Sequence, residues 1–143
     1  MNRTILFRGK RTDNEEWLEG SLITGVFFRD GKDIPYILDA DTSEYDCFIY
    51  EVDSETVCQL TGLTDKNGKK IWENDIVKIK FENPDGELNH YEYQNMKIVW
   101  DSEYLRWIYA DKCSDMDSLG ECYPDDIEVI GNIFDNPELL KED

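Results

Sequence analysis

The chain has 143 residues, of which 40% are hydrophobic and 13% aromatic, so it can build a self-sufficient core and is not expected to be disordered. Its formal net charge is −18, from 15 basic and 33 acidic residues. Such an excess of carboxylates repels nucleic acid phosphates, so we expect no direct nucleic-acid binding.

The acidic residues are distributed unevenly along the chain. Residues 1–38 hold six acids and six bases, whereas residues 39–56 hold seven acids and no base. Residues 57–80 hold three acids and five bases, residues 81–110 hold six and two, and residues 111–143 hold eleven and two. Solubility is the simplest interpretation of this charge. The alternative is an acidic DNA mimic that inhibits a DNA-binding protein, although the neutral first segment counts against it.

The N-terminal residues do not resemble a secretion signal. Arg3 and Arg8 flank an apolar run that is too short for a signal peptide, and no run in the chain is long enough to span a membrane. We therefore expect a cytoplasmic protein with no membrane partner.

The cysteines do not have the paired spacing of zinc ligands, so we expect reduced thiols, no metal and no cofactor. They are Cys47, Cys58, Cys113 and Cys122. A bridge between Cys113 and Cys122 stays open on geometric grounds.

Short runs of β-favouring residues, separated by Gly, Pro, Asn and Asp, predict strands in both halves of the chain. Asp30-Gly31 is a favoured hairpin turn, and Gly20 could mark a β-bulge. Asn136 followed by Pro137 predicts a short C-terminal helix, and residues 113–120 have the composition of a loop. The expected strands cover residues 4–8, 17–23, 26–28, 34–38, 45–52, 56–60, 75–81, 88–94, 97–100, 104–109 and 128–133.

This pattern predicts a mainly β fold, in which short antiparallel strands form a small bent barrel or sandwich with a short C-terminal helix. We expect a single domain over residues 1–143. Within it, an N-terminal sheet over residues 1–53 would be followed by a barrel-like part over residues 54–143.

The stretch from Thr56 to Ile79 combines several turn signals with apolar runs. Asn67-Gly68 tolerates the positive φ that a tight turn needs, and Glu73-Asn74-Asp75 predicts a second turn. The next residues alternate, with Val77, Ile79 and Phe81 expected inside and Lys78 and Lys80 outside.

This stretch resembles the YopX family of phage and prophage proteins. The matching residues are Thr56-Val57, Gln59, Thr61-Gly62-Leu63, Asp65-Lys66-Asn67-Gly68-Lys69, Ile71, Glu73 and Asp75-Ile76-Val77. A second anchor is Val129 to Ile133 with Asn136 to Leu139, and a weaker third is Phe7 to Lys10 with Trp17 and Glu19 to Ser21. The resemblance implies a β-rich phage or prophage protein of unestablished activity that assembles into homo-oligomers.

Three positions depart from the family pattern. Cys58 and Leu60 stand where the family commonly has glycine and an aromatic residue, and Asn74 stands where it commonly has glycine. Asparagine is a reasonable substitute at Asn74 if that position needs a positive φ.

No residue is predicted to be catalytic. His90 is the only histidine, and no partner that would activate it is evident from the sequence. Glu73 and Asp75 could form the acid–base pair of an unrecognised hydrolase, but carboxylates in turns more commonly accept backbone N–H groups. We therefore expect a non-enzymatic protein.

The least acidic stretch of the chain is the predicted interaction surface. It comprises Lys66, Lys69, Lys70, Trp72, Lys78 and Lys80. These lysines are expected to pair with acidic segments of the same or a neighbouring subunit. The expected partners are thus further copies of the chain, or a host or phage protein.

Overall fold

A computed structural model describes residues 5–39, 48–82, 86, 90–103, 105–110, 116–118 and 123–140. The chain divides into two compact units, Met1–Leu60 and Thr61–Asp143. The sequence-based subdivision was expected after residue 53. None of the helices among the described residues is long and apolar enough to cross a membrane.

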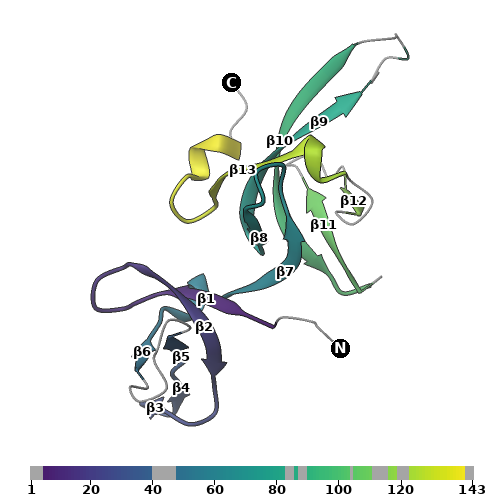
Figure 1. Cartoon of the computed structure of the whole chain (residues 1–143). Coiled ribbons are helices and arrows are strands. Elements are labelled where there is room, and N and C mark those ends of the chain that lie inside the picture. The colour runs from purple at the N-terminus through teal and green to yellow at the C-terminus, as the bar shows by residue number, and fades with distance from the viewer. Residues whose placement is uncertain are drawn as a thin grey trace. The chain divides into compact units, whose positions relative to one another are not determined.

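Unit 1 is an antiparallel sheet of short strands (Figure 1). Its strands are β1 (Phe7–Lys10), β2 (Trp17–Ile23), β5 (Tyr36–Asp39), β6 (Ile49–Glu51) and the first residues of β7 (Cys58–Thr64), in the order β6-β5-β2-β1-β7. A 3-10 turn, η1 (Ser54–Thr56), precedes β7. Leu18, Ile37 and Val52 form the buried centre.

Two local expectations in unit 1 have different outcomes. The predicted hairpin is confirmed: β3 (Phe28–Arg29) pairs with β4 (Lys32–Asp33), and both turn residues, Asp30 and Gly31, have positive φ. The bulge proposed at Gly20 is wrong, because the register runs without a break through its pairs with Phe7 and Asp39. Glycine is needed there because a side chain would collide with the carbonyl group of Leu38.

Unit 2 is built on an open antiparallel sheet (Figure 1). Its strands are β9 (Asp75–Glu82), β10 (Tyr91–Asp101), β11 (Arg106–Ala110), β12 (Met116–Ser118) and β13 (Ile127–Asn132), in the order β12-β11-β10-β9-β13. β7 ends in this unit, where β8 (Lys70–Trp72) pairs with it. The mainly β class is confirmed, but the sheets do not close into a barrel.

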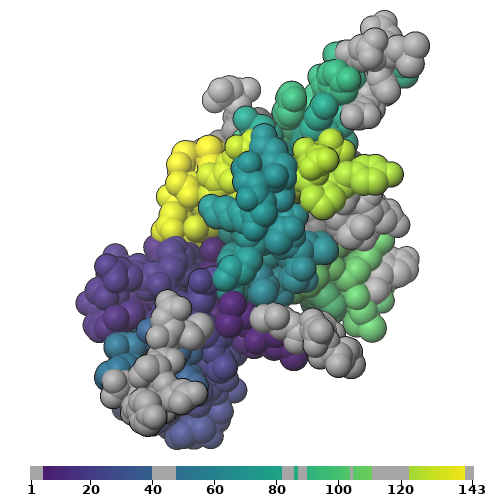
Figure 2. All heavy atoms as spheres, viewed as in Figure 1, coloured from purple at the N-terminus to yellow at the C-terminus, as the bar shows by residue number. Residues whose placement is uncertain are grey.

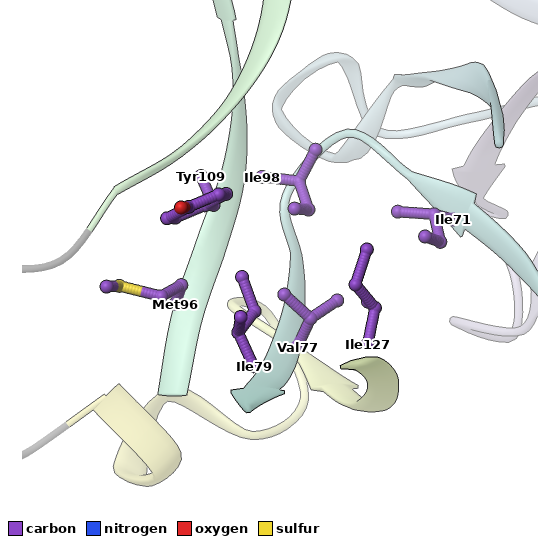
Figure 3. Close-up of a cluster of buried hydrophobic side chains, with 7 residues drawn as sticks. All are labelled: Ile71, Val77, Ile79, Met96, Ile98, Tyr109 and Ile127. Atoms are coloured by element: carbon purple, nitrogen blue, oxygen red, sulfur yellow. The ribbon is translucent and has the colours of Figure 1, made fainter. Parts of the chain in front are cut away.

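The core of unit 2 lies on one face of this sheet. Its buried members are Ile71, Val77, Ile79, Met96, Ile98, Tyr109 and Ile127 (Figure 3). The alternation predicted for β9 is confirmed, because Val77 and Ile79 are buried and Phe81 packs against them, whereas Lys78 is exposed.

Several predicted boundaries change in unit 2. The strands expected at residues 88–94 and 97–100 are one strand, β10, and β12 lies within the segment expected to be a loop. The predicted C-terminal helix is only a 3-10 turn, η4 (Pro137–Leu140), and a second 3-10 turn, η3 (Pro124–Asp126), precedes β13. The first part of the strand expected at residues 45–52 lies outside the described residues.

Truncation of Ile98 tests the assigned core. Ile98 is completely buried, so Ile98→Val should lower the free energy of unfolding by about 0.5–1.5 kcal/mol and Ile98→Ala by about 2–5 kcal/mol. Urea denaturation measures both values. Equal stability of the two variants and the parent chain would contradict the assignment.

Candidate interaction surface

Asp65 organises the first turn of the central stretch. It is 3% exposed, and its Oδ1 atom accepts the N–H groups of Asn67 and Lys69, both at 2.9 Å. The Gly68 N–H group donates to the Asp65 carbonyl oxygen at 3.0 Å, and Gly68 has a φ of 76°. The turn predicted from Asn67-Gly68 is therefore confirmed.

The same turn covers the outer edge of β13. Asp65 Oδ2 accepts the Val129 N–H group at 2.9 Å, and the Lys66 N–H group donates to the Ile127 carbonyl oxygen at 2.9 Å. These two contacts use the backbone groups that another strand would need, so this part of the edge is closed to strand addition. Lys66 Nζ also lies 3.0 Å from Glu128 Oε2, a largely exposed pair that contributes little stability.

The hydrogen bonds to Asp65 decide its charge state. Burial alone would raise the pKa of Asp65, because it disfavours the charged carboxylate. The N–H groups of Val129, Lys69 and Asn67, together with the charge of Lys69, outweigh burial and hold the pKa of Asp65 below its ordinary value. The ionised carboxylate thus joins two segments that are 64 residues apart.

A second turn, between β8 and β9, is held in a similar way. Asp75 is 2% exposed and its Oδ2 atom accepts the Trp72 N–H group at 2.8 Å, which supports the turn role over an acid–base pair with Glu73. Asn74 has a φ of 68°, so the expected reason for asparagine at this position is confirmed. The Asn74 N–H group donates to Ile98, and its carbonyl oxygen accepts from Ile133.

The C-terminal anchor is held by side-chain amides. Asn132 Oδ1 accepts the N–H groups of Phe134 and Asp135, at 3.0 and 2.9 Å, and the Asn136 side chain accepts from the Asn132 N–H group at 3.3 Å. A Cβ atom at Gly131 would lie 2.5 Å from Asn136 Oδ1, so glycine is required where this turn folds back on β13. The second anchor of the resemblance is thus also explained by folding.

The residues of the predicted interaction surface differ in how far they are exposed. Trp72 is only 4% exposed, so its indole ring supports the fold and offers little surface to a partner. Lys70 Nζ lies 5.8 Å from the centre of that ring. The exposed members are Lys66, Lys69, Lys70 and Lys78, and Lys80 is half-buried.

Two exposed tyrosines, which are not among the residues of the predicted interaction surface, lie beside Lys78 and Lys80. Lys80 is the register partner of Tyr93, and because side chains alternate along a strand, Lys78, Lys80, Tyr91 and Tyr93 share the outer face of β9 and β10. Tyr91 is 45% exposed and Tyr93 60% exposed, and Lys80 Nζ lies 4.1 Å from the centre of the Tyr91 ring. We call these four residues the lysine–tyrosine face. In the sequence, the spacing of two residues between Tyr91 and Tyr93 indicates that both side chains lie on the same face of a strand.

The lysine–tyrosine face extends onto a two-stranded arm. Pairing of β9 with β13 ends at Ile79, and pairing of β10 with β11 begins at Lys97. Residues 80–82 and 91–93 therefore form a ribbon without a third strand among the described residues. Figure 2 shows this ribbon standing clear of the other elements of unit 2.

Other residues considered for chemistry do not converge among the described residues. His90 is exposed, and no group of three or more residues able to hold a metal occurs in the described part of the chain. Cys58 is a buried free thiol whose Sγ atom lies 3.2 Å from the Thr56 carbonyl oxygen. Cys47, Cys113 and Cys122 lie outside the described residues.

Removal of the Asp65 carboxylate should destabilise unit 2. Asp65→Ala leaves the Val129 N–H group without its acceptor, so the free energy of unfolding should fall by at least about 1–3 kcal/mol. Guanidinium denaturation measures the change. Asp53→Asn is the matched control, because Asp53 accepts one N–H group at the start of η1 and asparagine serves that role equally well.

The contribution of Asp65 should depend on pH. Its pKa is lower in the folded than in the unfolded chain, so its stabilisation is complete above the unfolded pKa and is lost as the pH falls through the folded pKa. The stability difference between the parent chain and Asp65→Asn should therefore shrink on acidification. A difference that stays constant in denaturation series at successive pH values would contradict this role.

Comparison with known proteins finds a matching family and a similar solved structure. The family described as "YopX protein" matches residues 6–141. A solved structure, that of protein EF1440 from Enterococcus faecalis, is similar over 96% of this chain and 99% of its own, with 26% sequence identity and a TM-score of 0.55. No curated protein sequence matches the chain. The match over nearly all residues places both the turn around Asp65 and the C-terminal anchor inside the family pattern, and the chain belongs to the YopX family.

Proposed function

We propose that this protein is a non-enzymatic accessory protein of a phage or prophage that acts in the cytoplasm of the bacterial host through protein–protein contacts and self-association. The observation that carries the proposal is the lysine–tyrosine face on a chain whose net charge is −18. Membership of the YopX family is consistent with it, because the family resemblance implies homo-oligomers.

The composition of this face suits a protein partner. Tyrosine contributes a large, rigid contact area with a polar hydroxyl group, and it is enriched at protein interfaces. Lys78 and Lys80 supply positive charge beside Tyr91 and Tyr93, and a carboxylate-bearing surface would complement them. Such a surface is abundant in further copies of the chain, since residues 111–143 alone hold eleven acids and two bases.

The arm gives a second reason to expect a partner. A two-stranded hairpin is marginally stable alone in water, whereas a third strand or a packed surface stabilises it. The ribbon over residues 80–82 and 91–93 exposes the rings of Tyr91 and Tyr93 and has no third strand among the described residues. Contact with another protein would bury these rings and strengthen the hairpin.

Self-association should be sensitive to salt. Raising the ionic strength from 0.1 to 1 M shortens the screening length from about 10 Å to about 3 Å, which weakens attraction between lysines and carboxylates. Multi-angle light scattering should therefore give an oligomer at low salt and a smaller mass at high salt. A monomer at both salt concentrations rules out the proposed self-association.

Charge reversal locates the contact. The double variant Lys78→Glu with Lys80→Glu should lower the mass at low salt, because both substitutions lie on the lysine–tyrosine face. Lys32→Glu is the control, since Lys32 is an exposed lysine of β4 in unit 1. An equal loss of mass in the control would mean that net charge, and not this face, governs association.

A further inference from the structure

The Asn67-Gly68 dipeptide lies in the turn that closes the edge of β13. Asn67 is the only asparagine of the chain that glycine follows. Both residues are exposed, and a Cβ atom built on Gly68 would meet no other atom within 4 Å. The absence of a side chain after an asparagine lets the next backbone nitrogen reach the asparagine carboxamide, and both residues are accessible to solvent base.

We propose that Asn67 is a site of spontaneous deamidation, and that Asp65 controls its rate. The Gly68 backbone nitrogen loses its proton to solvent base and attacks Cγ of Asn67, forming an N–C bond. The C–N bond to the side-chain nitrogen breaks, and that nitrogen leaves as ammonia. One water then opens the five-membered imide, which gives aspartate or isoaspartate at this position. No oxidant, reductant or other protein is required.

The hydrogen bonds of the turn oppose this reaction. The Gly68 N–H group donates to the Asp65 carbonyl oxygen at 3.0 Å, so its proton and lone pair are not free to react while the turn is closed. Asp65 Oδ1 holds the N–H groups of Asn67 and Lys69 on either side of Gly68. Attack therefore requires the turn to open, and the stability of the Asp65 contacts sets how often it opens.

The product changes the edge of β13. Isoaspartate routes the main chain through the former side chain, which adds one carbon atom between the two N–H groups that share Asp65 Oδ1. Either product also adds a carboxylate beside Asp65, and like charges repel. The contacts of Asp65 with Val129 and of Lys66 with Ile127 should weaken, so the edge that the turn covers becomes open to another strand.

The test is to age the purified full-length chain in mildly alkaline buffer and map its peptides by mass spectrometry. Asn67 should lose its side-chain amide and be converted mainly to isoaspartate. It should react faster than Asn14, which is also exposed but is followed by glutamate. Asn67→Ser removes the reacting group and should give no change at this position. Retention of the amide at Asn67 while Asn14 reacts would overturn the proposal.

Control by Asp65 is tested by the folded and denatured rates. The folded parent chain should react about 5–30-fold more slowly than the chain in denaturant, the factor expected from the loss of one or two hydrogen bonds. Asp65→Ala should remove most of this protection, because it removes the oxygen that accepts the Asn67 and Lys69 N–H groups, and Asp53→Asn should keep it. If Asp65→Ala does not fold, the ratio for the parent chain still decides, because equal folded and denatured rates would overturn the role of Asp65.

The effect on β13 has its own measurement. Hydrogen exchange at the Val129 amide should become faster in aged parent chain and stay unchanged in aged Asn67→Ser. Unchanged exchange in both samples, with Asn67 fully converted, would show that the modification does not reach the edge of β13.

Discussion

A buried, ionised carboxylate at Asp65 is the constraint on which the arrangement of unit 2 depends. A charge taken out of water is costly unless donors surround it, and here the donors are backbone N–H groups of its own turn and of β13. One side chain therefore ties the turn after β7 to a strand 64 residues later. Asn74 makes a second connection to the C-terminal part of the chain, because its backbone carbonyl oxygen accepts the Ile133 N–H group. The two main anchors of the family resemblance meet through these contacts.

Features whose chemistry is local could be predicted from the sequence. Asp30-Gly31, Asn67-Gly68 and Asn74 lie in turns, and Asp30, Gly31, Gly68 and Asn74 adopt the positive φ that their residue types tolerate. The strand over residues 17–23 and the alternation along β9 follow from period-two patterning. The position of Trp72 could not be predicted, because lysines precede it and polar and acidic residues follow it, while the fold places its ring inside.

Tertiary contacts explain the other differences. A proline after Asn136 is a normal signal for a helix start, but the Asn136 side chain accepts from Asn132 and the Leu139 carbonyl oxygen accepts from Asn95. These contacts hold the segment as one 3-10 turn, so a helix does not propagate. Tyr93 shows that the candidate interaction surface, too, could be predicted only in part from the sequence. Its spacing from Tyr91 was visible, but only strand pairing places both rings beside Lys80.

The closed edge of β13 bears on where the protein can meet another chain. Open strand edges attract further strands, and natural sheets commonly cover them. The turn around Asp65 covers β13 at Ile127 and Val129, whereas the arm has no third strand among the described residues. We therefore propose that a partner strand would add at the arm, where the lysine–tyrosine face also lies, and not at this part of β13. A change that loosens the turn would uncover the Ile127 and Val129 backbone groups, so the same carboxylate that stabilises the fold also keeps this edge covered.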